Sequence, residues 1–388
     1  MTEPTGAAGV RLGEIIARLN AFYPPALAEP WDRVGLICGD PEDQVNEIVL
    51  ALDCTEDVVD TAIEWGAQLI IIHHPLLLRG TSTVATTDPK GRLIHRLIKN
   101  GIALFAAHTN ADSARPGVND KLAEILGVTP GRPIAPRSLN PQDKWGVYVP
   151  VDYVTVVKDA VFAAGAGQIG NYSHCAYEIE GRGQFQPEEG ANPSVGSVGK
   201  LYSSVETRVE FTAPRGRRAA IEAAMRAAHP YEEPAFDITA VESTDMTYGL
   251  GRVGELDEPM TLRNFTQRVA DRLPVTAWGV RAAGDPERMI RTVAVGSGAG
   301  DSFLDDVRRL GVDCYVTSDL RHHPVDEALR KGGPAIIDTA HWASESPWLD
   351  QVNELLAPVF PSINITNLGI RTDPWTIHAK NHATEEEV

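Results

Sequence analysis

The sequence has 388 residues, of which 43% are hydrophobic and 23% charged, a composition typical of a globular protein with two or three domains. No apolar run approaches the roughly 18–20 residues that cross a bilayer, and the first residues do not resemble a signal peptide, so we expect a cytoplasmic protein without membrane contact. The formal net charge of −18 disfavours nucleic-acid binding, and four scattered cysteines argue against a disulfide framework.

Residues 1–128 alternate between helical and strand patterns. Apolar spacing predicts a first helix over 12–21. Buried strands are predicted over 47–53, 68–72 and 102–107, with helices over 56–65 and 91–99 between them. Thr55 can cap the first of these two helices and Gly66 can end it. This order predicts parallel strands with right-handed crossovers.

The composition changes in the middle of the chain. Four prolines mark residues 129–145 as a linker. Residues 146–242 then follow the order strand, helix, strand, strand, helix, strand, which is that of a ferredoxin-like module. The Gly-rich stretch 181–199 is predicted to be a flexible hairpin tip.

The α/β rhythm returns over residues 249–378, and an acidic tail, 379–388, follows. Strands are predicted over 292–296, 314–317 and 335–338, helices over 301–310 and 324–331, and a long helix from about His341. Each outer segment contains strand, helix, strand and His-His-Pro, which indicates either an internal duplication or the similarity of any two βαβ units. The predicted fold class is α/β: two similar α/β halves form one metal-binding domain, interrupted by a ferredoxin-like (βαββαβ) insert.

His73 and His74 stand where a buried strand ends. Neighbouring side chains of a strand point to opposite faces, so two imidazoles diverging at the turn could address two nearby metal ions. Open α/β sheets bind their ligands at the carboxyl ends of parallel strands. The alternative is that these are ordinary solvated loop histidines.

Three more candidate ligands follow other strands. Asp112 comes after the third strand, where the alternative role is a turn or cap residue. His341 and Glu345 are four residues apart, a spacing that puts both on one face of a helix, although an exposed helix pair has the same spacing. Histidine and carboxylate ligands suit zinc, iron, manganese, cobalt or nickel. Five protein ligands exceed the three of one catalytic zinc and favour two divalent metals about 3.5–4 Å apart, a centre typical of hydrolases.

A second tier of polar residues lies near the same strand ends. His108, Asp319 and His323 are candidates for a general acid or base or for partners behind the ligands, and local loop hydrogen bonding is the alternative. The run Gly296–Gly300 could cradle phosphate, but Asp301 would repel an anion and the Walker lysine is absent, which favours a tight turn.

Five motifs, in this order and spacing, resemble the NGG-one-interacting-factor-three family, whose members are often labelled GTP cyclohydrolase I type 2 homologues. They are Trp31–Leu36 (WDRVGL), Ile71–Pro75 (IIHHP), His108–Asp112 (HTNAD), Tyr315–Asp319 (YVTSD) and His341–Glu345 (HWASE). The middle module, with His229–Pro234 (HPYEEP), is similar to the PII- or CutA-like insert of the longer bacterial members.

The resemblance implies two metals at the residues matching His73, His74, Asp112, His341 and Glu345, and a ring-shaped homohexamer with the metal sites facing an internal cavity. Arg33, Ser318 and Ala340 depart from the family pattern, which has Asn, Gly and Gly there; none of them is a ligand position. A family resemblance is a better guide to the fold and the metal site than to the substrate.

The leading functional hypothesis is a metal-dependent hydrolase of a small, nucleotide-like substrate that could carry phosphate, with His323 or His108 carrying protons. The first alternative is a metal-binding or regulatory assembly without catalysis, which a PII/CutA-like insert favours. The second is a transcription-related adaptor, which the charge of −18 argues against as a direct DNA binder.

Overall fold

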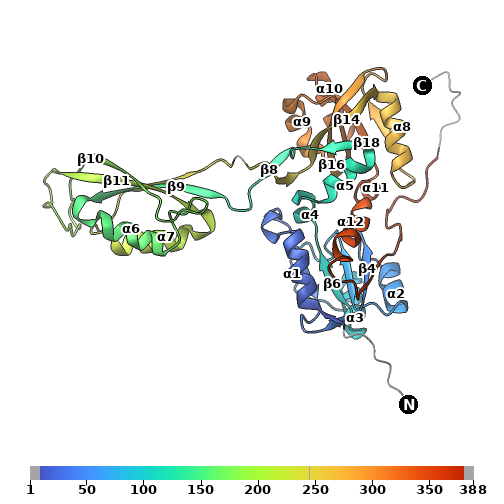
Figure 1. The fold of residues 1–388 in the computed structure, drawn as a ribbon, viewed down its shortest axis with the longest axis horizontal. Coiled ribbons are helices and arrows are strands. Elements are labelled where there is room, and N and C mark those ends of the chain that lie inside the picture. Colours follow the sequence, from blue (N-terminus) through green and yellow to red (C-terminus); the bar gives the residue numbers. More distant parts are fainter. Residues whose placement is uncertain (1–8, 244, 380–388) are drawn as a thin grey trace, which may run out of the picture. The chain divides into compact units, whose positions relative to one another are not determined.

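The computed structural model describes residues 9–243 and 245–379, and the chain divides into two compact units. Unit 1 comprises the chain up to Arg137 together with the chain from Asp245 onward, and unit 2 begins at Ser138. Both units combine helices with sheets (Figure 1). Of the predicted acidic tail, residues 380–388 lie outside the described residues. No helix within the described ranges is long and apolar enough to cross a bilayer.

The first sheet of unit 1 has five strands. In spatial order they are β19 (Asn364–Asn367), β4 (Glu47–Ala51), β5 (Leu69–Ile72), β6 (Ala103–Ala106) and β2 (Gly35–Cys38). The first four are parallel, and β2 runs antiparallel to β6. Helices α2 (Glu56–Glu64) and α3 (Pro89–Lys99) connect β4, β5 and β6 in the predicted order. The pairing of β19, from the far end of the chain, was not predicted.

Local sequence signals account for where these two helices begin and end. The hydroxyl of Thr55 accepts a hydrogen bond from the backbone N–H of Val58 (3.3 Å), so Thr55 is the N-cap of α2, as predicted. Gly66 follows the helix with a φ of +67°, a conformation that glycine adopts without strain. Helix α3 starts two residues earlier than predicted because Asp88 caps it and Pro89 occupies its first position.

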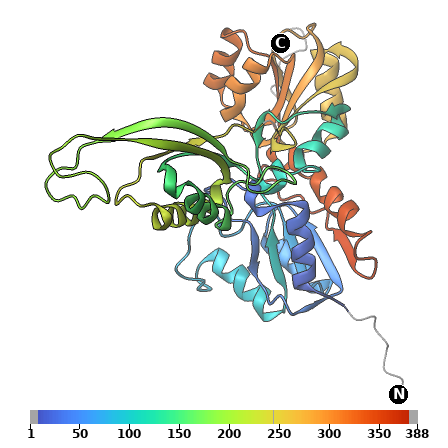
Figure 2. The same cartoon turned by 60° about the vertical axis from the view of Figure 1, so that its left-hand side comes forward.

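Helices cover both faces of this sheet. Apolar residues of α2 and α3 pack against Val49, Ile70 and Leu104 on one face. Helix α1 (Leu12–Phe22) lies on the opposite side of the strands from α2 (Figures 1 and 2). A short two-stranded sheet, β1 (Val10–Arg11) with β3 (Gln44–Val45), flanks α1. Sheet residues buried on both faces explain the continuous apolar runs in the sequence.

The second sheet of unit 1 has six strands. In spatial order they are β15 (Arg281–Ala283), β18 (Ala335–Thr339), β17 (Cys314–Ser318), β16 (Met289–Ala299), β14 (Arg252–Thr261) and β7 (Val128–Pro130). The strands β16, β17 and β18 are parallel and the other pairings are antiparallel. Helices α9 (Leu304–Leu310) and α10 (His322–Arg330) connect the parallel strands.

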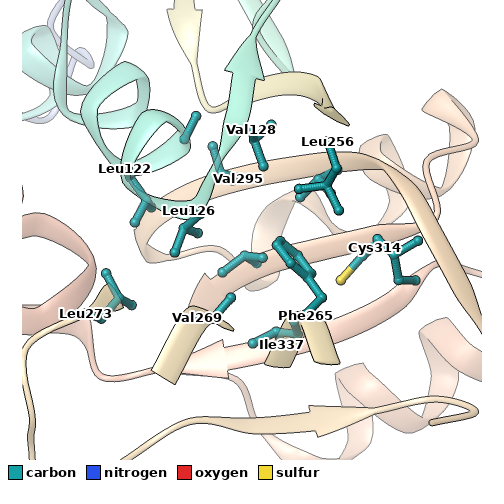
Figure 3. Close-up of a cluster of buried hydrophobic side chains, with 14 of the residues drawn as sticks. Leu122, Leu126, Val128, Leu256, Phe265, Val269, Leu273, Val295, Cys314 and Ile337 are labelled. Carbon is teal, nitrogen blue, oxygen red and sulfur yellow. The ribbon is translucent and has the colours of Figure 1, made fainter. Parts of the chain in front are cut away.

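A large apolar cluster lies on one face of the second sheet (Figure 3). Helix α8 (Leu262–Arg272) contributes Phe265 and Val269, and α5 (Val118–Leu126) contributes Leu122 and Leu126. Because α5 comes from the first 128 residues, the first segment of the chain helps to build the core under the second sheet. Helices α9 and α10 pack on the other face of the sheet.

Two sequence predictions in unit 1 need correction. The stretch 129–145 is not a plain linker: β7 ends at Pro130, and β8 (Ala135–Arg137) pairs with β13 (Tyr248–Leu250). Pro130 and Pro136, which lie in these strands, are tolerated because both strands lie at sheet edges, where a missing N–H costs no ladder hydrogen bond. The predicted long helix from His341 is two helices, α11 (His341–Glu345) and α12 (Pro347–Leu356), since Pro347 starts a new helix.

Unit 2 contains β9 (Gln142–Pro150), α6 (Val154–Ala163), β10 (Tyr177–Phe185), β11 (Tyr202–Pro214), α7 (Arg218–Ala228) and β12 (Phe236–Ala240). Its strands form one antiparallel sheet in the order β10-β11-β9-β12. Trp145, which is fully buried, stacks between Phe211 and Phe236 in the core under the two helices. Residues 181–185, predicted to be part of a loose hairpin tip, instead extend strand β10.

Candidate metal centre

The carboxyl ends of parallel strands from both sheets of unit 1 lead into one polar cluster. His73 and His74 directly follow β5, and Asp112 lies on α4 (Thr109–Ser113), just after β6. His341 and Glu345 are the first and last residues of α11, which follows β18 in the other sheet. The cluster thus lies where open α/β sheets bind their ligands.

Glu345 lies at the centre of these five residues. Its Oε1 is 3.1 Å from His341 Nε2 and 3.6 Å from His73 Nε2, and its Oε2 is 2.9 Å from His74 Nε2. Asp112 Oδ1 lies 3.6 Å from His73 Nε2. The structure therefore brings together all five residues that the sequence singles out as metal ligands.

A second layer of oxygens holds the three imidazoles. In each ring Nδ1 is hydrogen-bonded to an oxygen, and Nε2 faces Glu345. The Nδ1 partners are the backbone carbonyl of Ala107 for His73 (2.8 Å), Asp53 Oδ1 for His74 (2.8 Å) and Asp319 Oδ2 for His341 (2.7 Å). Histidines that bind metals are commonly held in this way, because the second nitrogen fixes the tautomer and orientation of the ring.

Two atoms at the centre of the cluster are buried without a hydrogen-bond partner among the described residues. They are His73 Nε2 and Glu345 Oε2; the latter is close to His74 Nε2 but not aligned with it as a hydrogen bond. Buried polar atoms are normally satisfied, and leaving one unpaired costs about 1–3 kcal/mol. A metal ion would satisfy both atoms, so the donor set fits a metal site. His74, His341 and Glu345 by themselves form a compact group of possible ligands.

The cluster attracts protons when no metal is bound. The charge of Glu345 is the largest cause that raises the pKa of His341, to about 11. Burial lowers the pKa of His74, but Glu345 and Asp53 outweigh it and raise that pKa to about 10. Burial alone would raise the pKa of Glu345, yet the surrounding imidazoles hold it well below its ordinary value. Burial also raises the pKa of Asp112.

The three residues of the second tier have different positions. His108 lies beside the cluster, with its ring centroid 5.1 Å from that of His73, and its Nδ1 is 2.9 Å from Asp32 Oδ1. Asp319 contacts His341 and has a φ of +59°, a strained conformation for a residue other than glycine. His323 is exposed at the start of α10, and no contact with the cluster is recorded within the described ranges.

Four further residues at the site are not among the predicted ligands or acid–base candidates. Asp32 and Asp53 hold His108 and His74 through their carboxylates. Asp32 belongs to the WDRVGL motif, and Asp53 is the last residue of the predicted strand 47–53; these are the signals that could have marked them. Ser297 contacts Asp112 through its hydroxyl (3.1 Å), and the backbone N–H of Gly298 donates to Ser344 Oγ (3.0 Å), next to Glu345.

The run Gly296–Gly300 is part of the candidate centre, not a tight turn between strand and helix. Its residues up to Ala299 form the end of β16, where the register shifts relative to β17, and Gly300 follows the strand. Gly298 has a φ of +62°, and a Cβ there would lie 2.5 Å from Glu345 Oε1 and 3.1 Å from His341 Nε2. Glycine at this position therefore leaves room for the side chains of the cluster.

Gly298→Ala is expected to weaken metal binding about 10–100-fold, because the new methyl group would displace the Glu345 carboxylate. Competition with a chelator measures this affinity. Gly311→Ala is the matched control: Gly311 also has a positive φ (+70°), but a Cβ there meets nothing within 4 Å. Equal metal affinity in the two variants would contradict the requirement for space at Gly298.

Cavities lie on two sides of the cluster. One, of about 520 Å³, is lined by Asp112, His341 and Glu345 together with Trp31 and Phe303. His108 also lines it. The other, of about 310 Å³, is lined by His74, His341 and three tryptophans, Trp278, Trp342 and Trp375. The larger cavity is within the size range of small-molecule sites, about 300–1,000 Å³.

Several known proteins are similar to this chain in sequence. A family model described as Duf34/NIF3 (NGG1p interacting factor 3) matches residues 10–374. The Mycobacterium tuberculosis protein named GTP cyclohydrolase 1 type 2 homolog is 52% identical over 370 residues, 95% of this chain and 97% of that protein. The Bacillus subtilis protein of the same name is 42% identical over 332 residues, 86% of this chain and 88% of that protein.

Solved structures show the same similarity. The Bacillus cereus protein related to NIF3 has a TM-score of 0.64 and 37% identity, and the alignment covers 95% of this chain and 99% of that one. Staphylococcus aureus protein SA1388 has a TM-score of 0.71 and 31% identity, with the same two coverages. The similarity therefore extends over unit 2 as well as unit 1.

Proposed function

This chain belongs to the Duf34/NIF3 (NGG1p interacting factor 3) family, and we propose that it is a dinuclear-metal-dependent hydrolase of a small, nucleotide-like molecule. The single observation that carries this proposal is the central position of Glu345, whose two carboxylate oxygens face different histidines. A carboxylate in this position can serve two ions at once.

The proposed ligands form two groups that share Glu345. His73 and Asp112 belong to the first group, and His74 and His341 to the second. Zinc, iron, manganese, cobalt and nickel all suit such ligands. Bound metals would supply Lewis acidity and an activated water near neutral pH. Asp53 and Asp319 orient the histidines of the second group.

The larger cavity is the proposed substrate site. Its aromatic residues, Trp31 and Phe303, offer flat apolar surface to a heterocyclic ring, and the cluster lies in its wall. The name of the relatives, GTP cyclohydrolase 1 type 2 homolog, motivates a nucleotide-like substrate. His108 lines the same cavity and is held by Asp32, so we assign proton transfer to His108 in preference to His323.

The test is a turnover assay of the metal-loaded chain against nucleotides, phosphoesters and cyclic amides. His108→Gln is expected to lower kcat about 10²–10⁴-fold, as expected for a group that transfers protons. Its metal content is measured in parallel, because His108 also lies within ligand distance of His73 and His74. His323→Gln is the control and is expected to leave kcat unchanged. Metal binding without turnover of any compound would overturn the hydrolase and would favour the alternative, a non-catalytic metal-holding or regulatory assembly.

Metal binding is expected to release protons and to strengthen as pH rises. His74 and His341 have pKa values of about 10 and about 11 without metal, so both are protonated at pH 7, and a metal can bind only to their neutral rings. We expect about two protons released per chain at pH 7. Calorimetric titration in two buffers with different ionisation enthalpies measures this number, and metal uptake without proton release would contradict it.

We also propose that unit 2 is a ferredoxin-like, PII/CutA-like insert and that the chain forms a ring-shaped homohexamer. The first part is supported by the spatial strand order β10-β11-β9-β12 and by the chain order, in which α6 follows β9 and α7 follows β11. The family resemblance supports the second. Light scattering should give a mass six times that of the chain, and a monomer or dimer at micromolar concentration would overturn the hexamer.

A further inference from the structure

Unit 2 contains a cavity of about 470 Å³ that has no part in the proposed metal chemistry. Its walls come from the β10–β11 hairpin, the segment between these two strands and the His229–Pro234 motif that follows α7. All lining residues belong to unit 2, so the cavity is complete within that unit. Its volume is in the range of small-molecule sites.

The segment between β10 and β11 forms a defined wall of this cavity. Pro187, Ala191 and Pro193 line the cavity from this segment. The backbone N–H of Gly199 donates to the carbonyl of Pro187 (2.7 Å) and closes the segment on itself. The backbone N–H of Asn192 donates to Glu232 Oε2 (3.0 Å) and ties the segment to the His229–Pro234 motif.

A buried carboxylate faces this largely apolar space. Glu206 lines the cavity and is only 8% exposed. Its Oε1 accepts a hydrogen bond from the Tyr231 hydroxyl (2.8 Å), and its Oε2 lies over Gly183, where a Cβ would be 2.2 Å away. The absent side chain of Gly183 therefore makes room for the carboxylate.

No cation inside the cavity balances Glu206. The lining contains three glutamates and no lysine, arginine or histidine. No ion pair to Glu206 is recorded among the described residues, whereas the rim residue Glu233 lies 3.4 Å from Arg226. Arg208, which packs over Tyr148, is paired with Asp237 and Glu210. A carboxylate buried without a cation is costly, so the cavity favours a positively charged occupant.

Aromatic rings beside Glu206 favour the same kind of ligand. Tyr148, Phe185 and Tyr231 all line the cavity, and Phe185 meets Tyr231 at a centroid distance of 5.4 Å. Ring faces attract cations, and aromatic residues with a carboxylate recognise ammonium groups. We propose that this cavity binds a small organic cation, with an ammonium or guanidinium group at Glu206 and an apolar body along the prolines. This inference is independent of the proposed hydrolase.

The test compares two probes of similar shape on the full chain: 2-phenylethylamine, which is charged at pH 7, and 2-phenylethanol, which is neutral. Ligand-observed NMR titration gives both dissociation constants. The amine is expected to bind at least about 10-fold more tightly than the alcohol. Glu206→Gln is expected to remove this preference, whereas Glu180→Gln, the same change on the exposed surface of β10, is expected to keep it.

The proposal would be overturned if the unaltered chain bound the amine and the alcohol equally, or bound neither. This part of the test uses no variant, so it does not depend on the folding of Glu206→Gln. A preference for the amine that survives in folded Glu206→Gln would overturn the role of Glu206. Metal content is expected to be the same in all these variants. A change in metal content thus reports on the proposed metal centre and not on this cavity.

Discussion

Glu345→Gln is expected to abolish binding of the two proposed metals. Among the described residues, only the carboxylate of Glu345 lies within 3.6 Å of all three histidines of the cluster, which are His73, His74 and His341. Loss of a residue behind a ligand typically costs about 10–100-fold in metal affinity, and loss of a shared ligand should cost more. Elemental analysis after dialysis against a weak chelator measures the metal retained per chain.

Glu354→Gln is the matched control for this experiment. Glu354 lies on α12 and forms an exposed ion pair with Lys121. Its substitution removes the same charge at a position outside the cluster. We expect this variant to retain the metal content of the unaltered chain. If Glu345→Gln kept both metals as well, Glu345 would not be a shared ligand, and the dinuclear proposal would fail.

Arg252→Met is expected to lower the free energy of unfolding by about 3–5 kcal/mol, because it leaves the buried carboxylate of Asp120 with only a longer ion pair to Arg115 (3.7 Å). Arg252 is fully buried at the start of β14, and its guanidinium is 2.8 Å and 2.9 Å from the two carboxylate oxygens of Asp120 on α5. It also donates to the carbonyls of Gly249 and Gly251. This pair joins α5, from the first segment, to the second sheet.

Urea unfolding followed by circular dichroism measures this loss. Arg263→Met, which breaks an exposed ion pair with Glu287, is the control and should cost much less, since exposed salt bridges contribute little. The double variant Arg252→Met with Asp120→Leu should regain part of the stability, because it removes both buried charges. Equal loss in Arg252→Met and Arg263→Met would show that the buried pair does not stabilise the unit.

The candidate ligands can be predicted from the sequence because each follows a strand that can be recognised locally. The apolar run 69–72 ends at His73, and the spacing of His341 and Glu345 indicates one helix face. His323 was selected by the same logic and lies away from the cluster, because His322 and His323 begin α10 and do not sit directly at the end of β17. A His-His-Pro motif therefore does not by itself place its imidazoles at a strand end.

Among the carboxylates behind the ligands, the sequence indicates only Asp319, which follows the predicted strand 314–317 and does hold His341. Asp53 and Asp32 cannot be found in this way. Asp53 is 21 residues from His74, and Asp32 is 76 residues from His108. Asp319 is 22 residues from His341. Their pairing depends on which strands are neighbours, and the pairing of β19 with β4 shows that even the far end of the chain enters the first sheet. Single-sequence periodicity contains no information on such long-range contacts.

The sequence by itself determined the central parallel strands and the cap of α2 at Thr55, and it indicated the candidate metal ligands. These follow from side-chain periodicity and capping, which act within a few residues. The tertiary structure alone decided that two sheets direct their carboxyl ends at one cluster, that Gly298 leaves room for Glu345, and that Glu206 is enclosed by aromatic rings. Such features arise from packing between segments far apart in the chain, where burial and desolvation, and not local propensity, set the energy.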